Sequence, residues 1–136
     1  MFSIILTSVL IIVAAISNAV MDTLQFHYGG SIFKKKCWGD PRKDTWKNKW
    51  KLDEEGNAIV GKERFLFSST ILVFLTDAWH LFQFTMLVAL ITAISFYESQ
   101  SGLLYIKGIE ILAMYVLFGL TFELFFSKIF KSNESS

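Results

Sequence analysis

An aspartate and a histidine stand three residues apart in VFLTDAWHLFQF, the otherwise almost entirely apolar stretch 73–84. On a helix, Asp77 and His80 would share one side, a spacing at which a carboxylate and an imidazole can reach one metal ion. Oxygen and imidazole ligands together suit zinc, manganese or iron(II). The structural alternative is that Asp77 forms hydrogen bonds to Ser, Thr, Asn or Trp79 and fixes helix packing.

Three more ionisable residues lie in or beside the other apolar segments: Asp22, His27 and Glu123. Asp22 and Glu123 each fall on the polar or small-residue side of a helix. His27 precedes two glycines that can end a helix, so its role stays open between interfacial residue and ligand. Because a charge inside a bilayer needs a counter-charge, we predict that these three residues lie close to the Asp77–His80 pair, around a shared cation. The catalytic group would be Asp22, Asp77 and His80, and a divalent metal ion would be bound by these three with His27 and Glu123.

Three apolar segments, 2–23, 66–97 and 103–127, must position these residues. The chain of 136 residues is 53% hydrophobic and 16% aromatic, more apolar than a typical soluble domain. Each segment reaches the roughly 20 residues that a helix needs to cross a bilayer. We therefore predict an all-α polytopic membrane protein, one helical domain over 1–136 with three transmembrane helices. The turn ESQSG, 98–102, would make the last two antiparallel neighbours, and the long 66–97 segment would tilt, bend or start obliquely at the interface.

The distribution of basic residues predicts the orientation. Ten of the 13 Lys and Arg lie within 28–64, and the loop 98–102 has none. The positive-inside rule then places 28–64 and the C-terminus in the cytoplasm and the N-terminus outside. Ser17-Asn18-Ala19 is similar to a signal-peptide cleavage site, but no basic residue precedes the apolar run, so we expect a retained helix.

The loop 28–64 alternates tryptophan with basic residues. Indole rings prefer the lipid headgroup layer, and lysines beside them can meet lipid phosphates. This pattern is typical of an interfacial anchor, and also of a surface that grips a phosphate-bearing lipid or an acidic partner. Six acidic residues in the same loop argue against nucleic acid. The residues predicted to contact lipid are Lys34, Lys35, Lys36, Trp46, Lys47, Lys49 and Trp50.

Two functions from different classes fit these features. In the first, the metal site at the inner leaflet activates water against a phosphate-bearing lipid. In the second, a homo-oligomer conducts protons or cations along the acids, because three helices are too few to enclose a pathway. A third option is an accessory subunit of a larger membrane complex. No P-loop, HExxH, CxxC or GxSxG motif is present, which excludes the common soluble-enzyme mechanisms.

Four longer stretches of the sequence carry a resemblance to known proteins: SNAVMDTLQFHY, TWKNKWK, ERFLFSSTILVFLTDAWHLFQF and LFGLTFELFF. They resemble the shared segments of a group of small bacterial integral membrane proteins with no assigned activity. The resemblance covers most of the chain. It implies a membrane protein and brings no substrate or cofactor with it.

Overall fold

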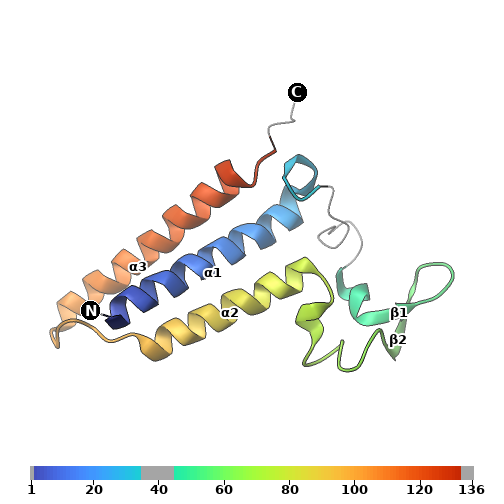
Figure 1. Cartoon of the computed structure of the whole chain (residues 1–136), viewed down its shortest axis with the longest axis horizontal. Helices are drawn as coiled ribbons and strands as arrows, with labels where there is room; N and C mark the ends of the chain where they lie inside the picture. Colours follow the sequence, from blue (N-terminus) through green and yellow to red (C-terminus); the bar gives the residue numbers. More distant parts are fainter. Residues whose placement is uncertain (1, 35–44, 133–136) are drawn as a thin grey trace.

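The computed structural model describes residues 2–34 and 45–132, and three long helices dominate it (Figure 1). They are α1 (Phe2–Phe26), α2 (Ala78–Phe96) and α3 (Leu104–Leu124), the last extended by the π-helical turn η5 (Phe125–Ile129). Each is long and apolar enough to cross a membrane. Helix α1 lies between the other two and packs against both. The predicted set of three long apolar helices is therefore confirmed.

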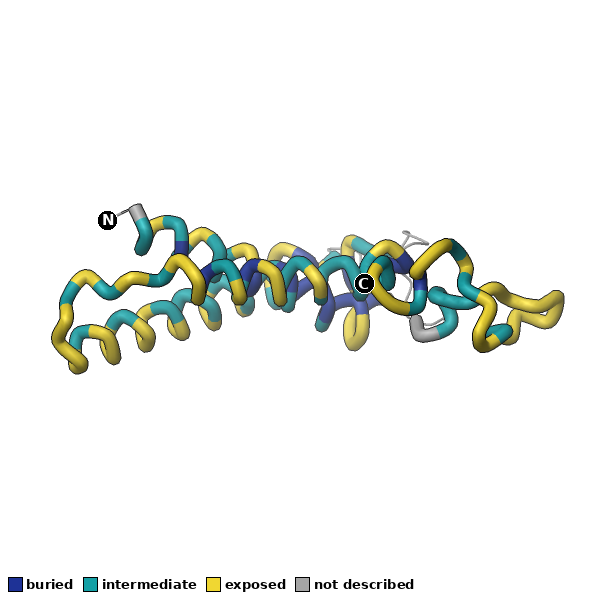
Figure 2. Tube along the Cα trace, turned by 90° about the horizontal axis from the view of Figure 1, so that it is seen from below, coloured by how far each residue is buried: buried dark blue, intermediate teal, exposed yellow. Residues whose placement is uncertain are grey.

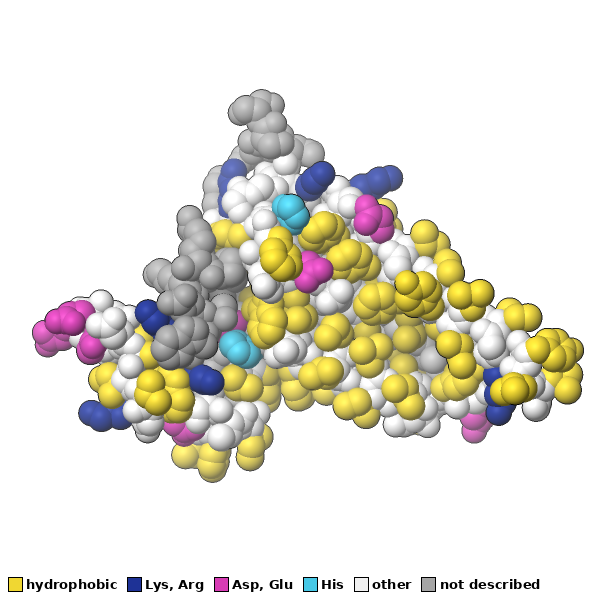
Figure 3. All heavy atoms as spheres, turned by 180° about the vertical axis from the view of Figure 1, so that it is seen from behind, with side chains coloured by type: hydrophobic (Ala, Val, Ile, Leu, Met, Phe, Trp, Pro, Cys, Tyr) yellow, Lys and Arg dark blue, Asp and Glu magenta, His cyan; other side chains and the backbone are white. Residues whose placement is uncertain are grey.

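Small residues let α1 occupy the centre. Ala14, Ala15 and Ala19 on α1 are completely buried, and Ala89 and Ala93 on α2 nearly so. Small side chains allow helix backbones to approach closely. In lipid, where the hydrophobic effect does not drive helices together, this close van der Waals packing does. Helix α2 has three buried residues and α3 has none, so half-buried and exposed residues make up most of both helices (Figure 2). Hydrophobic side chains cover the helices on the face in Figure 3, with charged residues toward the ends. This distribution fits a bundle surrounded by lipid.

The two ends of the bundle differ. We call the end with the start of α1 and the loop 97–103 the turn end. There the Ser3 hydroxyl donates to the Phe96 carbonyl and accepts from the Glu98 N–H, which ties α1 to the loop. The other end, where α1 and α3 finish and α2 begins, is called the polar end. At this end the Ile32 N–H donates to the Phe130 carbonyl at 3.0 Å and the Ser132 N–H to the Gly30 carbonyl at 2.8 Å.

A small β-hairpin interrupts the helical fold at the polar end. The 3₁₀ turns η1 (Tyr28–Gly30) and η3 (Thr45–Lys49) come before it, and strands β1 (Trp50–Leu52) and β2 (Ala58–Glu63) pair antiparallel. Asp53 Oδ1 accepts from the N–H groups of Glu55 and Asn57, and Gly56 has φ +83°, a left-handed conformation suited to glycine. These bonds form the turn between the two strands, and the hairpin was not predicted from the sequence.

Helix α2 is shorter than the predicted segment 66–97. Residues 65–77 form turns that include the 3₁₀ helix η4 (Val73–Leu75). The Glu63 carboxylate accepts from the Ser69 hydroxyl and from the N–H groups of Ser69 and Phe67, and these bonds hold the pKa of Glu63 below its usual value. Phe67 takes φ +60°, which ends any helix there. Side-chain bonds to the backbone have replaced the helical ones that the apolar pattern predicted.

Candidate functional site

Asp77 and His80 meet where α2 begins. The backbone of Asp77 is extended, with φ −161° and ψ 171°, and its side chain caps the helix by accepting from the His80 N–H at 3.0 Å. The other carboxylate oxygen, Oδ2, lies 2.7 Å from His80 Nδ1. The predicted proximity of the two side chains is correct, although Asp77 precedes the helix and is not inside it.

The contacts of Asp77 come from two separate segments. Asn48, in η3, donates its side-chain amide to Oδ2 at 3.1 Å, and the Thr76 hydroxyl lies 3.2 Å from the same oxygen. Asp77 is only 4% exposed. The structural alternative predicted hydrogen bonds from Asp77 to Thr or Asn side chains, and both kinds of contact are present. Trp79 instead packs edge-on against the His80 ring, with centroids 5.3 Å apart.

The environment of Asp77 sets the tautomer of His80. Burial disfavours the charged carboxylate, but hydrogen bonds from the His80 ring, the His80 N–H and the Asn48 amide outweigh it and lower the pKa of Asp77. An ionised Asp77 can only accept, so Nδ1 of His80 carries a proton, and in the neutral imidazole Nε2 is the nitrogen with the lone pair. Within 2–34 and 45–132, the hydrogen bonds of the ring all involve Nδ1. A carboxylate that orients a histidine in this way is common to general bases and to metal-bound histidines.

The other predicted ligands do not join this pair. Across the described ranges, no three His, Cys, Asp or Glu side chains form a group that could hold a metal ion. Glu123 is exposed on α3 and accepts from the Ser127 hydroxyl. The predicted convergence of Asp22, His27 and Glu123 with Asp77 and His80 is thus not seen. The prediction assumed that the polar sides of all three helices face one another, whereas α1 lies between α2 and α3 and packs against both.

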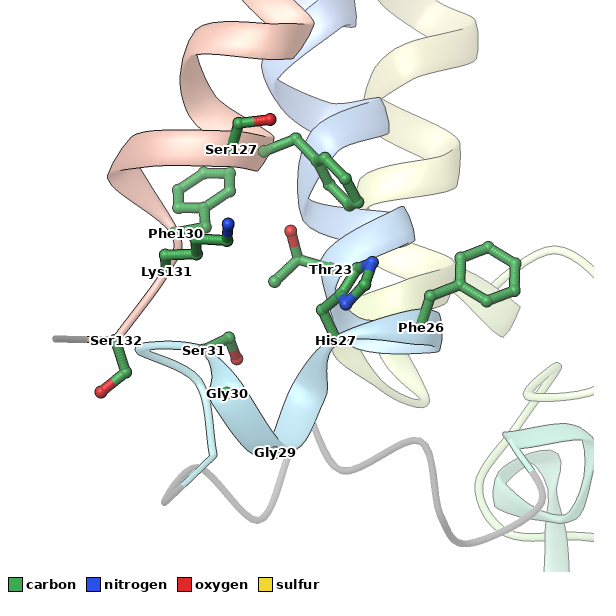
Figure 4. A pocket seen from close by; sticks show the side chains of 11 residues that line it. Thr23, Phe26, His27, Gly29, Gly30, Ser31, Ser127, Phe130, Lys131 and Ser132 are labelled. Carbon is green, nitrogen blue, oxygen red and sulfur yellow. The ribbon is translucent and has the colours of Figure 1, made fainter. Parts of the chain in front are cut away.

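His27 lies beyond the end of α1, at the edge of a pocket of about 590 Å³ (Figure 4). Its ring packs edge-on against Phe126, with centroids 5.0 Å apart. Lys131 borders the same pocket, held there by the backbone pairing of Ser31 with Lys131. The carbonyl ends of two helices lie nearby and favour the positive charge of Lys131. Lys131 was not singled out from the sequence, because only the fold brings residue 131 to residue 31.

No family model, curated protein or solved structure matches this chain. The resemblance to small bacterial membrane proteins therefore stays a prediction. Among the described residues, the Asp77–His80 pair has the geometry of a general base or of a metal-binding histidine.

The predicted lipid-contacting residues lie partly beyond what the structure describes. Lys35 and Lys36 fall outside the described residues, as does the side chain of Trp46. Lys49 is placed with its ammonium 5.7 Å from the centroid of the Trp50 ring, a cation–π distance. Lys47 and Lys49 flank Asn48 in η3, so the segment that reaches Asp77 also carries positive charge. The remaining member, Lys34, lies in the turn after α1.

Proposed function

We propose that this chain is an integral protein of a bacterial inner membrane that binds a phosphate-bearing lipid at the cytoplasmic surface, with His80 as the base. The observation that carries the proposal is the 2.7 Å contact between Asp77 Oδ2 and His80 Nδ1, which leaves Nε2 free to accept a proton. His80 would take the proton of a water or headgroup hydroxyl as that oxygen bonds to phosphorus, while Asp77 stabilises the imidazolium that forms. As the ester P–O bond breaks, the imidazolium returns the proton to the departing alcohol oxygen.

The surroundings of the pair suit an inner-leaflet lipid. The positive-inside rule places the polar end in the cytoplasm, with the N-terminus outside. Lys49 and Trp50 sit in the segment that binds Asp77 through Asn48, and indole and ammonium groups favour the headgroup layer. Leu66 and Ile71, in the turns before α2, are 71% and 73% exposed. Apolar side chains that face outward beside basic ones are typical of a surface that enters a membrane interface.

The divalent metal ion predicted from the sequence has less support than the base. Both oxygens of Asp77 already accept hydrogen bonds. Among the described residues, His80 Nε2 is therefore the metal ligand that this pair can offer. Catalytic metal sites usually take three protein ligands. Cys37, Asp40 and Asp44 lie outside the described residues. The proposed reaction therefore uses no metal ion, and whether the protein binds one is measured in the experiment below.

His80→Gln is the variant that tests the base. Glutamine can still donate to Asp77 but cannot accept a proton, so turnover of a phospholipid should fall about 100-fold or more while lipid binding stays unchanged. The assay uses nanodiscs of phosphatidylglycerol or phosphatidylcholine, with retained lipid and released headgroup measured by mass spectrometry and bound metal by elemental analysis.

His27→Gln serves as the matched control, since it removes the other histidine of the chain. It should keep turnover at the wild-type level. Equal turnover in His80→Gln and the wild type, or no protein-dependent product from either lipid, would contradict the proposal. Stoichiometric metal that disappears in His80→Gln would return the metal ion to the mechanism.

A second copy of the chain is the partner that α3 fits. Gly108 and Gly119 lie on its exposed side, a Cβ added at either would meet nothing within 4 Å, and Tyr115 between them is 74% exposed. Glycines on a bare membrane-facing side allow close approach of another helix. This supports our proposal of a homo-oligomer, which the conducting function would also require.

Gly119→Leu should shift the detergent-solubilised protein toward the monomer, because leucine separates the two backbones. Light scattering coupled to size-exclusion chromatography measures the mass. Ala113→Leu places the same bulk on a different side of α3 and should leave the mass unchanged. A wild-type monomer, or an oligomer that persists in Gly119→Leu, would rule out this interface.

A further inference from the structure

The carboxylate of Asp77 needs a second contact before it can hold the His80 ring in one orientation. Its Oδ1 accepts from the His80 N–H, which is the helix cap and fixes only one of the two oxygens. The other oxygen, Oδ2, lies 2.7 Å from His80 Nδ1, and it moves when the carboxylate plane turns about its broad side-chain torsion. A contact that fixes Oδ2 therefore also fixes the direction in which Nε2 points.

Two side chains other than His80 lie near Oδ2 in the described ranges. The Thr76 hydroxyl is 3.2 Å away, but it has one proton and makes a shorter bond, 2.7 Å, to the Val73 carbonyl. Asn48 donates its side-chain amide to Oδ2 at 3.1 Å from the turn η3, 29 residues earlier in the chain. Asn48 is therefore the described residue outside α2 that holds this oxygen.

The β-hairpin and the turn after it hold Asn48 in place. The carbonyl of the next residue, Lys49, accepts from the Ser68 hydroxyl at 2.7 Å and from the Arg64 N–H at 3.0 Å. Ser68 is completely buried, so its bond to η3 is shielded from water. Lys49 directly precedes β1 and Arg64 directly follows β2, so the hairpin closes behind Asn48.

We propose that Asn48 is a positioning residue, which holds Asp77 Oδ2 against the His80 ring so that Nε2 stays aimed at the reacting oxygen. The inference rests on the proposed function, in which His80 is the base. Outer partners that orient a histidine in this way are worth about 10- to 100-fold in affinity or activity, although they touch no substrate. The hairpin, which the apolar pattern did not predict, gains a role as the rigid support of this donor.

Asn48→Ala removes the donor and should lower phospholipid turnover about 10-fold, while the phosphatidylglycerol retained in nanodiscs stays at the wild-type amount. Asn57→Ala is the matched control, because the Asn57 amide also donates to an aspartate, Asp53 Oδ2 at 3.4 Å, in the hairpin turn. The control should keep wild-type turnover. An equal loss of turnover in both variants, or a loss in Asn48→Ala that follows a loss of retained lipid, would overturn the proposal.

The tautomer of His80 supplies a measurement that needs no turnover. Protein labelled with ¹⁵N in its histidine rings is compared at mildly alkaline pH, where histidine rings are ordinarily neutral. The chain has two histidines, so the spectrum of His27→Gln identifies the His80 signals. The wild type should carry the His80 proton on Nδ1, and Asn48→Ala should show a mixture of the Nδ1 and Nε2 forms.

His27 reports whether Asn48→Ala folds, because its ring packs against Phe126 of the bundle and should keep its wild-type signal. An unchanged His80 tautomer in folded Asn48→Ala would overturn the proposal, since Asp77 would then hold the ring unaided. If the wild type releases no product, the proposed function fails by itself, and the tautomer still decides whether Asn48 orients His80.

Discussion

Replacing Asp77 with alanine should destabilise the protein by about 2.5 kcal/mol, the sum of about 1 for the lost helix cap and about 1.5 for a hydrogen bond to a charged group. The change leaves the His80 N–H, the His80 ring and the Asn48 amide without their shared acceptor. The first turn of α2 should then open. Hydrogen exchange at the His80 amide measures this opening, and unfolding in detergent measures the total loss.

Asp77→Asn separates the cap from the charge. Asparagine caps helices about as well as aspartate, so this variant should keep the contribution of the cap and lose at most about 1.5 of the roughly 2.5 kcal/mol that Asp77→Ala loses. Acid supplies a second check. Because the folded state lowers the pKa of Asp77, its stabilisation is present at neutral pH and is lost as the pH falls below the ordinary value near 3.8. The stability difference between the wild type and Asp77→Asn should therefore shrink in acid. A difference that is constant with pH would show that the charge of Asp77 adds nothing.

Ala19→Leu should destabilise the bundle by about 1–3 kcal/mol because the central helix has no space for three more carbons. Ala19 is completely buried and packs in a cluster with Val20, Leu24 and Ala78. The larger side chain forces α1 away from its neighbours at the polar end. Unfolding of the purified protein by SDS in mixed micelles measures the loss.

Ala113→Leu is the matched control, since Ala113 is exposed on α3 and the change is chemically identical. It should change the free energy of unfolding by less than about 0.5 kcal/mol. If Ala19→Leu is equally harmless, α1 does not occupy the tightly packed centre that we describe.

Long uniform apolar segments were the part of this fold that could be predicted. Their length alone indicates spans, and a five-residue polar turn between two of them leaves little choice but an antiparallel pair. The start of α2 at Ala78 could not be predicted, because the apolar pattern runs on through 65–77. The bonds of Glu63 to residues 67 and 69 keep that stretch out of the helix, and the extended backbone of Asp77 sets where α2 begins. Likewise, three-residue spacing brought out Asp77 and His80, but Asn48 reaches Asp77 from a distant turn.

Helical periodicity also explains why the wider cluster was predicted and not found. It shows which residues share a side of one helix but not which helix that side faces. With α1 between α2 and α3, a polar side on one outer helix does not have to face the polar side of the other.

The backbone bonds between Gly30–Ile32 and Phe130–Ser132 have a consequence for biogenesis. They join the end of α1 to the end of η5, so they cannot form until all three long helices have been synthesised. A loop that closes over some three quarters of the chain forms late, after the local contacts within each helix. These bonds should therefore stabilise only the assembled bundle, and hydrogen exchange at their amides should report the last step of its folding.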